Sequence, residues 1–200
     1  HGSRLIVVAC NTASVAALRS LREMYPQTPF VGMEPAVKPA AAATRSGTVG
    51  VLATTGTLAS SRFAALLDTF GRDVHVVTRP GSGLVEAVER GEFDTPATRA
   101  LVASHIEPLL AEGADVIVLG CTHYPFLRPL IEAAAGPAVQ VIDTGDAVVR
   151  QLSRALEARG LRCSGRTGRE SFWSSAAHAS GRAALQRLWP PAGAIQPLPV

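Results

Sequence analysis

Residues 115–125 read DVIVLGCTHYP, and this stretch decides the fold. Its first half is a continuous apolar run without polar alternation, which is typical of a strand buried on both faces of a parallel sheet. A cysteine follows the run, and a helix is expected from Pro125 onward. Residues 4–12, RLIVVACNT, repeat the pattern. Each stretch therefore predicts a buried strand that runs directly into a cysteine and then into a helix.

Outward from these two stretches, short β-rich runs alternate with longer helical ones. Strands are expected at residues 4–10, 30–33, 48–53, 74–78, 115–120 and 139–142. Helices are expected at residues 12–24, 35–44, 58–70, 84–90, 96–111, 125–135 and 146–159. After residue 160 the pattern weakens, with a strand at 171–173 and a helix at 177–188. Repeated strand–helix–strand units predict an α/β protein with mostly parallel sheets.

The composition excludes several classes of protein. Hydrophobic residues make up 47% of the 200 residues and charged residues 18%, which excludes a wholly disordered chain. The longest apolar runs are too short to span a bilayer and no signal peptide opens the chain, so no membrane association is expected. Three cysteines, an odd and sparse number, favour free thiols in a reducing compartment such as the cytoplasm.

The net charge of +3 is unevenly distributed along the chain. Residues 150–187 carry eight arginines against Glu157 and Glu170. A basic tail of this kind can touch nucleic acid, but it more often forms a solvated helical face. No nucleic-acid motif and no interleaved aromatic residues accompany it, so nucleic acid is not an expected partner.

Cys10 and Cys121 are the residues to which the pattern assigns chemistry. Both lie at the carboxyl end of a predicted parallel strand, where ligands bind in open α/β sheets, and a helix N-terminus follows each. That position favours a thiolate and attracts carboxylates, and Asn11, Thr12 and Thr122 add side-chain donors. Two thiols and a set of carboxylate donors suit proton exchange at the α-carbon of an amino acid, which needs one base on each face of that carbon.

Other interpretations of the cysteines stay open. They could be small buried hydrophobes at strand ends, or two of them could join in a disulfide. Cys10, Cys121, His123 and Cys163 could together bind zinc, but the chain has no Cys-x-x-Cys pair and Cys-x-His is not a usual zinc spacing. No metal is therefore expected. The repeated cysteine–threonine arrangement favours proton exchange.

Two separated motifs resemble those of a known family. Residues 9–14, ACNTAS, and residues 120–125, GCTHYP, look like the two signature motifs of the glutamate racemases, within the cofactor-independent aspartate/glutamate racemase superfamily. One departure is Arg79, which stands where the family usually has a cysteine before proline. Further segments similar to the family are residues 34–35 (EP), 50–57 (GVLATTGT), 80–86 (PGSGLVE) and 142–144 (IDT).

The resemblance implies an isomerase that interconverts L- and D-glutamate and supplies D-glutamate for peptidoglycan. Cys10 and Cys121 would be the two bases, Cys10 acting on the D-enantiomer and Cys121 on the L-enantiomer. His123 would assist Cys121 and contact the substrate, and Glu86 would set pKa values near the pocket. The other substrate-binding residues are expected to be Asn11, Thr12, Thr54, Thr57 and Thr122. No cofactor is expected, and Lys38 is the only lysine.

The resemblance also implies two pseudo-symmetric lobes with mostly parallel sheets, flanking helices and the active site in the cleft between them. Residues 1–34 and 144–200 would form the first lobe, and residues 35–143 the second. The strand at 4–10 corresponds to the family's third, so the first lobe is expected to be truncated in this chain by two N-terminal βα units. Whether the chain is active alone, and whether it forms a homodimer, stays open.

Two other functions remain as alternatives. One is a non-catalytic binding role, such as inhibition of DNA gyrase. The other is a related aspartate racemase. The pair Thr122-His123 favours glutamate, because aspartate racemases usually have Thr-Glu at this point.

Overall fold

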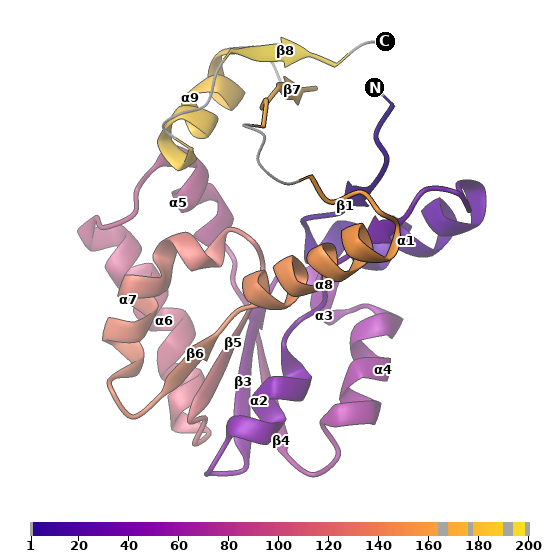
Figure 1. Cartoon of the computed structure of the whole chain (residues 1–200). Coiled ribbons are helices and arrows are strands. Elements are labelled where there is room, and N and C mark those ends of the chain that lie inside the picture. Colours follow the sequence, from indigo (N-terminus) through magenta and orange to yellow (C-terminus); the bar gives the residue numbers. More distant parts are fainter. Residues whose placement is uncertain (1, 164–167, 176–177, 190–193, 199–200) are drawn as a thin grey trace.

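The computed structural model describes residues 2–163, 168–175, 178–189 and 194–198. In this part of the chain the strands form three parallel sheets (Figure 1). The largest sheet has the order β4-β3-β5-β6, and the other two are the pairs β1-β2 and β7-β8. The strands are β1 (Ile6–Val7), β2 (Phe30–Val31), β3 (Thr48–Ala53), β4 (His75–Pro80), β5 (Val116–Gly120), β6 (Gln140–Ile142), β7 (Phe172–Ser174) and β8 (Ile195–Pro197).

Helices follow almost every strand, and together with the parallel sheets they confirm the α/β prediction. They are α1 (Asn11–Met24), α2 (Val37–Ala43), α3 (Thr55–Leu58), α4 (Ser61–Phe70), α5 (Leu84–Arg90), α6 (Pro96–Ala111), the 3-10 helix η1 (Tyr124–Leu127), α7 (Arg128–Ala135), α8 (Gly145–Ala158) and α9 (His178–Leu188). Within the described ranges, each helix is too short or too polar to cross a membrane.

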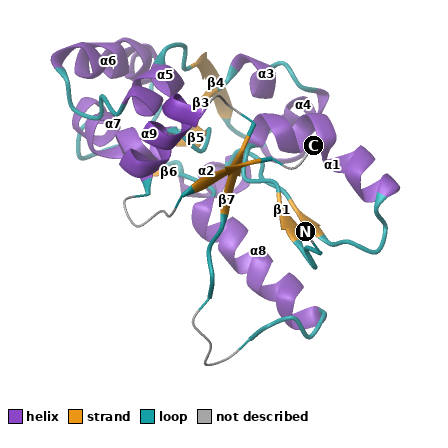
Figure 2. Cartoon of the chain, turned by 90° about the horizontal axis from the view of Figure 1, so that it is seen from above, coloured by secondary structure: helices purple, strands orange, loops and turns teal. Residues whose placement is uncertain are grey.

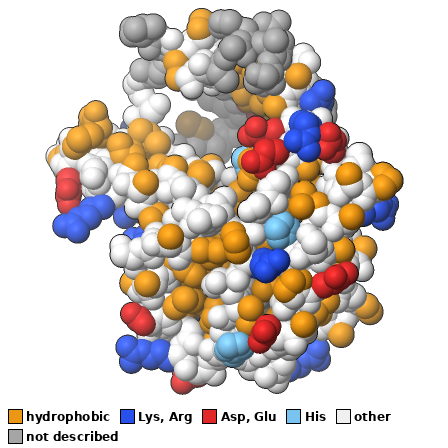
Figure 3. Space-filling model, turned by 180° about the vertical axis from the view of Figure 1, so that it is seen from behind, with side chains coloured by type: hydrophobic (Ala, Val, Ile, Leu, Met, Phe, Trp, Pro, Cys, Tyr) orange, Lys and Arg blue, Asp and Glu red, His pale blue; other side chains and the backbone are white. Residues whose placement is uncertain are grey.

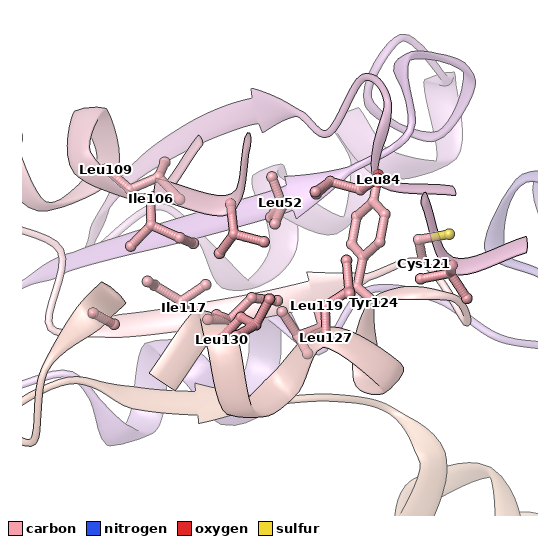
Figure 4. Packing of buried hydrophobic residues seen from close by; sticks show 14 of the residues in the cluster. Leu52, Leu84, Ile106, Leu109, Ile117, Leu119, Cys121, Tyr124, Leu127 and Leu130 are labelled. Carbon is pink, nitrogen blue, oxygen red and sulfur yellow. The ribbon is translucent and has the colours of Figure 1, made fainter. Parts of the chain in front are cut away.

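The four-stranded sheet divides the core into two layers because side chains alternate between its faces. Leu52, Ile117 and Leu119 point to one face and pack with buried residues of α5, α6 and α7. Figure 4 shows this cluster, with Cys121 at its end beyond Leu84 and Tyr124. Val51 and Val118 point to the other face and pack with α2 and α4. Covering both faces in this way is what a parallel sheet requires.

The two central strands end level with each other. Ala53 pairs with Gly120, the last residue of β5. A Cβ on Gly120 would lie 2.7 Å from the Cβ of Ala53, so only glycine allows the strands to approach this closely. The loops that follow β3 and β5 therefore emerge side by side at the carboxyl edge of the sheet.

The small sheet β1-β2 lies beside α1, and α8 contacts β2 (Figures 1 and 2). The strand expected at residues 4–10 is shorter in the structure, because Ile6 and Val7 alone align with β2 and Cys10 already caps α1. α8 is amphipathic, yet among the described residues none of its side chains is fully buried.

Other element boundaries also differ from the sequence-based expectations. The helix expected at 58–70 begins three residues later as α4, because Ser60 caps it by accepting the N–H of Phe63. Leu58 instead ends the short helix α3, which Thr54 caps. The helix expected at 125–135 begins one residue earlier as the 3-10 turn η1, and Pro129 lies in the first turn of α7. The strand β8 was not expected; it is three residues long and ends on a proline, Pro197, which is uncommon within a sheet.

Candidate active site

Cys10 lies where the chain passes from β1 into α1. It is the N-cap of that helix, in an extended conformation, and its sulfur accepts the N–H of Ala13 at 3.5 Å. Ser14, one turn into α1, fixes this junction. Its hydroxyl donates to the carbonyl of Val8 and accepts the N–H of Met33, both at 3.0 Å. The half-buried thiol is therefore held at the mouth of a helix N-terminus, as the sequence predicted.

Cys121 directly follows β5 and is only 8% exposed. Its sulfur lies 3.8 Å from Nδ1 of His123, whose Nε2 lies 3.3 Å from Oε1 of Glu89 on α5. Burial raises the pKa of the Cys121 thiol, hydrogen bonds from the main-chain N–H groups of His123 and Tyr124 lower it, and the charge on Cys10 raises it. The net pKa is above the usual range of a thiol.

Glu89 was not among the residues singled out from the sequence, which favoured Glu86 on the same helix. Glu86 lies one turn before Glu89 and borders a cavity of about 170 Å³ with Thr54 and Tyr124. Burial raises the pKa of Tyr124 strongly, and the charges on Cys121 and Glu86 raise it further. Both carboxylates thus face the candidate site, one at the cavity and one at His123. In the space-filling view from behind, acidic side chains gather at the rim of a hollow (Figure 3).

Three threonine hydroxyls form a triangle that joins α1 to the loop after β3. Thr12 Oγ1 lies 2.7 Å from Thr54 Oγ1 and 3.1 Å from Thr57 Oγ1, and Thr54 Oγ1 donates to Thr57 Oγ1 at 3.1 Å. Thr57 is fully buried, whereas Thr12 and Thr54 are half-buried. The structure therefore brings together three of the predicted substrate-binding residues from two distant parts of the chain.

Asn11 is the first residue of α1 and is only 2% exposed. In the described part of the chain, neither its Nδ2 nor its Oδ1 has a hydrogen-bond partner. Burying an amide without partners costs about 1–3 kcal/mol, so native proteins seldom do it. A polar ligand that pairs with both atoms would remove this cost. Thr122 is half-buried between Cys121 and His123, close enough in the chain to face the same ligand.

The open alternatives for the cysteines can be compared with the coordinates. Cys10, Cys121 and Cys163 are all free, so they do not form a disulfide in this structure. Cys163 is exposed on the segment after α8. Within the ranges that the structure describes, no group of three or more His, Cys, Asp or Glu side chains could hold a metal ion. The groups that the site does present are thiols, an imidazole, carboxylates and hydroxyls, which can transfer protons and donate hydrogen bonds.

The sequence of this chain is similar to those of known racemases. The sequence profile of the Asp/Glu/Hydantoin racemase family matches residues 1–152. The chain is 57% identical over 189 residues to the glutamate racemase of Pseudomonas putida strain KT2440, covering 94% of this chain and 71% of that protein. It is 55% identical over 189 residues to the glutamate racemase of Pseudomonas aeruginosa strain PAO1, with the same shares covered.

Solved structures are similar over nearly the whole chain. The glutamate racemase isoform RacE1 from Bacillus anthracis superposes with a TM-score of 0.85 at 28% identity, covering 98% of this chain and 74% of that one. Escherichia coli glutamate racemase, in complex with L-glutamate and the activator UDP-MurNAc-Ala, gives a TM-score of 0.84 at 28% identity with the same coverage. The chain belongs to the Asp/Glu/hydantoin racemase family.

Proposed function

We propose that this chain is a glutamate racemase, an isomerase that interconverts L- and D-glutamate by moving the α-proton between two thiols. The observation that carries the proposal is the pairing of Cys10 and Cys121. They follow strands of two different sheets, yet the hydroxyl of Thr12, on the helix that Cys10 caps, lies 2.7 Å from that of Thr54, in the loop after β3. That loop emerges beside the end of β5, which Cys121 follows. The relatives named glutamate racemase, at 55% and 57% identity, support the choice of glutamate.

The reaction needs a thiolate on one face of the α-carbon and a thiol on the other. With D-glutamate, the Cys10 thiolate takes the α-proton as the C–H bond breaks. The Cys121 thiol then donates its proton to the opposite face and is left as a thiolate. The raised pKa of Cys121 keeps it protonated at neutral pH, the form that a proton donor needs. With L-glutamate the two thiols exchange these roles.

His123 and Glu89 continue from Cys121 as a series of acid–base contacts. His123 Nδ1 faces the sulfur at 3.8 Å, and Nε2 faces the Glu89 carboxylate at 3.3 Å. An imidazole in this position can pass a proton to or from the sulfur and so reset Cys121 between turnovers. We assign Glu89 to orienting the ring, and Glu86, at the cavity, to the electrostatics of the substrate site.

We assign substrate binding to the polar groups around the two thiols. Asn11 offers a buried amide whose donor and acceptor lack protein partners among the described residues. The hydroxyl triangle offers donors that can turn from one another to a carboxylate. The residues of this set are Asn11, Thr12, Thr54, Thr57, Thr122 and His123.

We further propose that residues 1–34 and 144–200 form one lobe and residues 35–143 the other, with the thiols facing each other between them. Supply of D-glutamate for peptidoglycan follows from the family. We assign the activity to the cytoplasm, because free cysteines persist in that reducing compartment. A homodimer is the assembly to look for first, by sedimentation with and without glutamate.

The proposal is tested by α-proton exchange in D₂O, followed by proton NMR with L- and D-glutamate. The unchanged chain should lose the α-signal of either enantiomer, and Cys10→Ser or Cys121→Ser should each abolish racemisation. Aspartate is the control substrate. A folded chain that exchanges no proton would favour a binding role alone, and faster exchange on aspartate would favour an aspartate racemase.

A further inference from the structure

His105 is a buried histidine for which the proposed chemistry has no role. It lies on α6, on the face that also carries the core residues Val102, Ile106 and Leu109, and it is 8% exposed. An apolar side chain would pack there without any loss of hydration, whereas an imidazole brings two polar nitrogens into the core. A histidine at this position therefore calls for a polar partner.

The partner is the main-chain carbonyl of Ser82, which lies 2.9 Å from Nε2. A carbonyl oxygen only accepts, so Nε2 carries the proton and donates it. Nδ1 is also buried, and among the residues that the structure describes it has no partner. The single hydrogen bond that the ring makes here is thus directed at the Ser82 carbonyl.

Ser82 belongs to the turn 81–83 between β4 and α5, and other groups hold the same turn. The hydroxyl of Tyr124 donates to the carbonyl of Gly81 at 3.2 Å, and the N–H of Gly81 donates to the carbonyl of Ala53 at 3.0 Å. A Cβ on Gly81 would lie 2.4 Å from the Tyr124 hydroxyl, so this position needs glycine. The turn is therefore fixed by β3, by the segment after Cys121 and, through His105, by α6.

This turn is part of the substrate site that we propose. Residues 81–83 line the cavity of about 170 Å³ together with Thr54, Glu86 and Tyr124. Tyr124, whose hydroxyl holds the Gly81 carbonyl, also donates its main-chain N–H to the carbonyl of Cys121 at 3.2 Å. A single residue therefore connects the turn to the proposed catalytic cysteine. A displacement of the turn would move the cavity wall and the first turn of α5, which carries Glu86.

We propose that His105 is a positioning residue for the racemase reaction: from α6 it holds the Ser82 carbonyl and so fixes the turn 81–83 as a wall of the substrate cavity. The inference rests on the proposed function, because the consequence for catalysis requires glutamate to occupy this cavity. Displacing reacting groups by about 1 Å can cost about 100-fold in rate, so a remote hydrogen bond can matter in this way.

Two variants separate positioning from packing. In His105→Gln the amide nitrogen lies as many bonds from the main chain as Nε2 does, so it can still donate to Ser82. In His105→Leu the volume is filled but the donor is lost. We expect His105→Leu to lower kcat/KM for glutamate about 10- to 100-fold and His105→Gln to stay within about threefold of the unchanged chain. A purely structural role would instead lower activity in step with thermal stability in both variants.

Amide hydrogen exchange at three hydrogen-bonded N–H groups of this segment supplies a readout that does not depend on turnover. They are those of Gly81, Leu84 and Ala87, which donate to the carbonyls of Ala53, Gly81 and Gly83. These amides should exchange about tenfold faster in His105→Leu and at the original rate in His105→Gln. Unchanged exchange in His105→Leu, or faster exchange with unchanged kcat/KM, would overturn the inference, and so would a Gln variant that behaves like Leu. If the unchanged chain does not racemise glutamate, the proposed function fails, and the exchange rates still decide whether His105 fixes the turn.

Discussion

Asp115 joins the start of β5 to the turn that precedes β3. Its carboxylate accepts hydrogen bonds from Thr44 Oγ1 at 2.5 Å and from the main-chain N–H groups of Arg45 and Ser46 at 2.7 and 2.9 Å. Burial raises the pKa of Asp115, but these hydrogen bonds outweigh it and lower the pKa from 3.8 to about 2. Because charged Asp115 is favoured in the folded chain, it should stabilise the fold above about pH 4, and this contribution should disappear as the pH falls towards 2.

The size of the effect follows from the shift in pKa. A difference of about two pH units corresponds to about 2.5 kcal/mol, and solvent screening of a half-buried carboxylate reduces this to about 1–2 kcal/mol. Asp115→Asn keeps one acceptor oxygen but turns an NH₂ group towards a donor. We therefore expect the variant to lose about 1–2 kcal/mol in the free energy of unfolding at neutral pH.

Urea unfolding of the unchanged chain and of Asp115→Asn, measured from pH 7 down to about pH 3, tests this expectation. The gap between the two unfolding free energies should narrow below about pH 4, because the carboxyl of the unfolded chain takes up a proton while the folded one, with its pKa of about 2, still holds its charge. Asp68→Asn, on the exposed face of α4, is the matched control and should show little change. A gap that is as wide at pH 3 as at pH 7, or no larger than that of the control, would refute the reasoning.

Three further predictions concern the site. Burial raises the pKa of Cys121, so the rate of its alkylation by iodoacetamide should still increase with pH beyond about pH 9. Mass spectrometry can follow the reaction with the exposed Cys163 as internal reference, and a rate that levels off near neutral pH would contradict the prediction. Glu89→Gln should lower kcat about fivefold, because an exposed ion pair contributes up to about 1 kcal/mol, and an unchanged kcat would show that the pair is not used. Thr57→Val keeps the side-chain shape but removes one hydrogen-bond partner from each of the Thr12 and Thr54 hydroxyls. The free energy of unfolding in urea should therefore fall by about 1–3 kcal/mol, and an unchanged urea midpoint would contradict this.

The fold was predictable because its central strands carry a strong local signal. β3 and β5 are almost entirely buried, and a continuous apolar sequence of this length is typical of a central strand of a parallel sheet. The alternation of these strands with helical segments then leaves a parallel sheet with helices on both faces. The length of the strand near the N-terminus was overestimated. Its apolar sequence shows how many residues could pair with a neighbour, but only Ile6 and Val7 do so.

Helix boundaries were less predictable because capping competes with periodicity. The apolar spacing from 58 to 70 suits one helix, yet Ser60 takes an extended conformation and accepts the N–H of Phe63, which starts a new helix. The hydroxyl of Thr54 does the same for α3, and that choice also brings it to Thr12. The side chain of Thr54 therefore both starts a helix and contributes to the candidate site. A hydrophobic pattern does not predict either role, because both depend on the hydrogen bonds of a hydroxyl group.

The site residues also fall into two groups. Some could be proposed from their position at the end of an apolar run, whereas others depend on how the helices pack against one another. Cys10 and Cys121 could be proposed from the sequence because each ends a continuous apolar run. The partner of His123 could not, because Glu86 and Glu89 are one turn apart on α5 and both point to the same side of that helix. The carboxylate that reaches Nε2 depends on how α5 sits against η1, which is fixed by core contacts spread over much of the chain. Acid–base partners of this kind are a property of packed helices, so they have to be read from the structure even where both thiols are evident in the sequence.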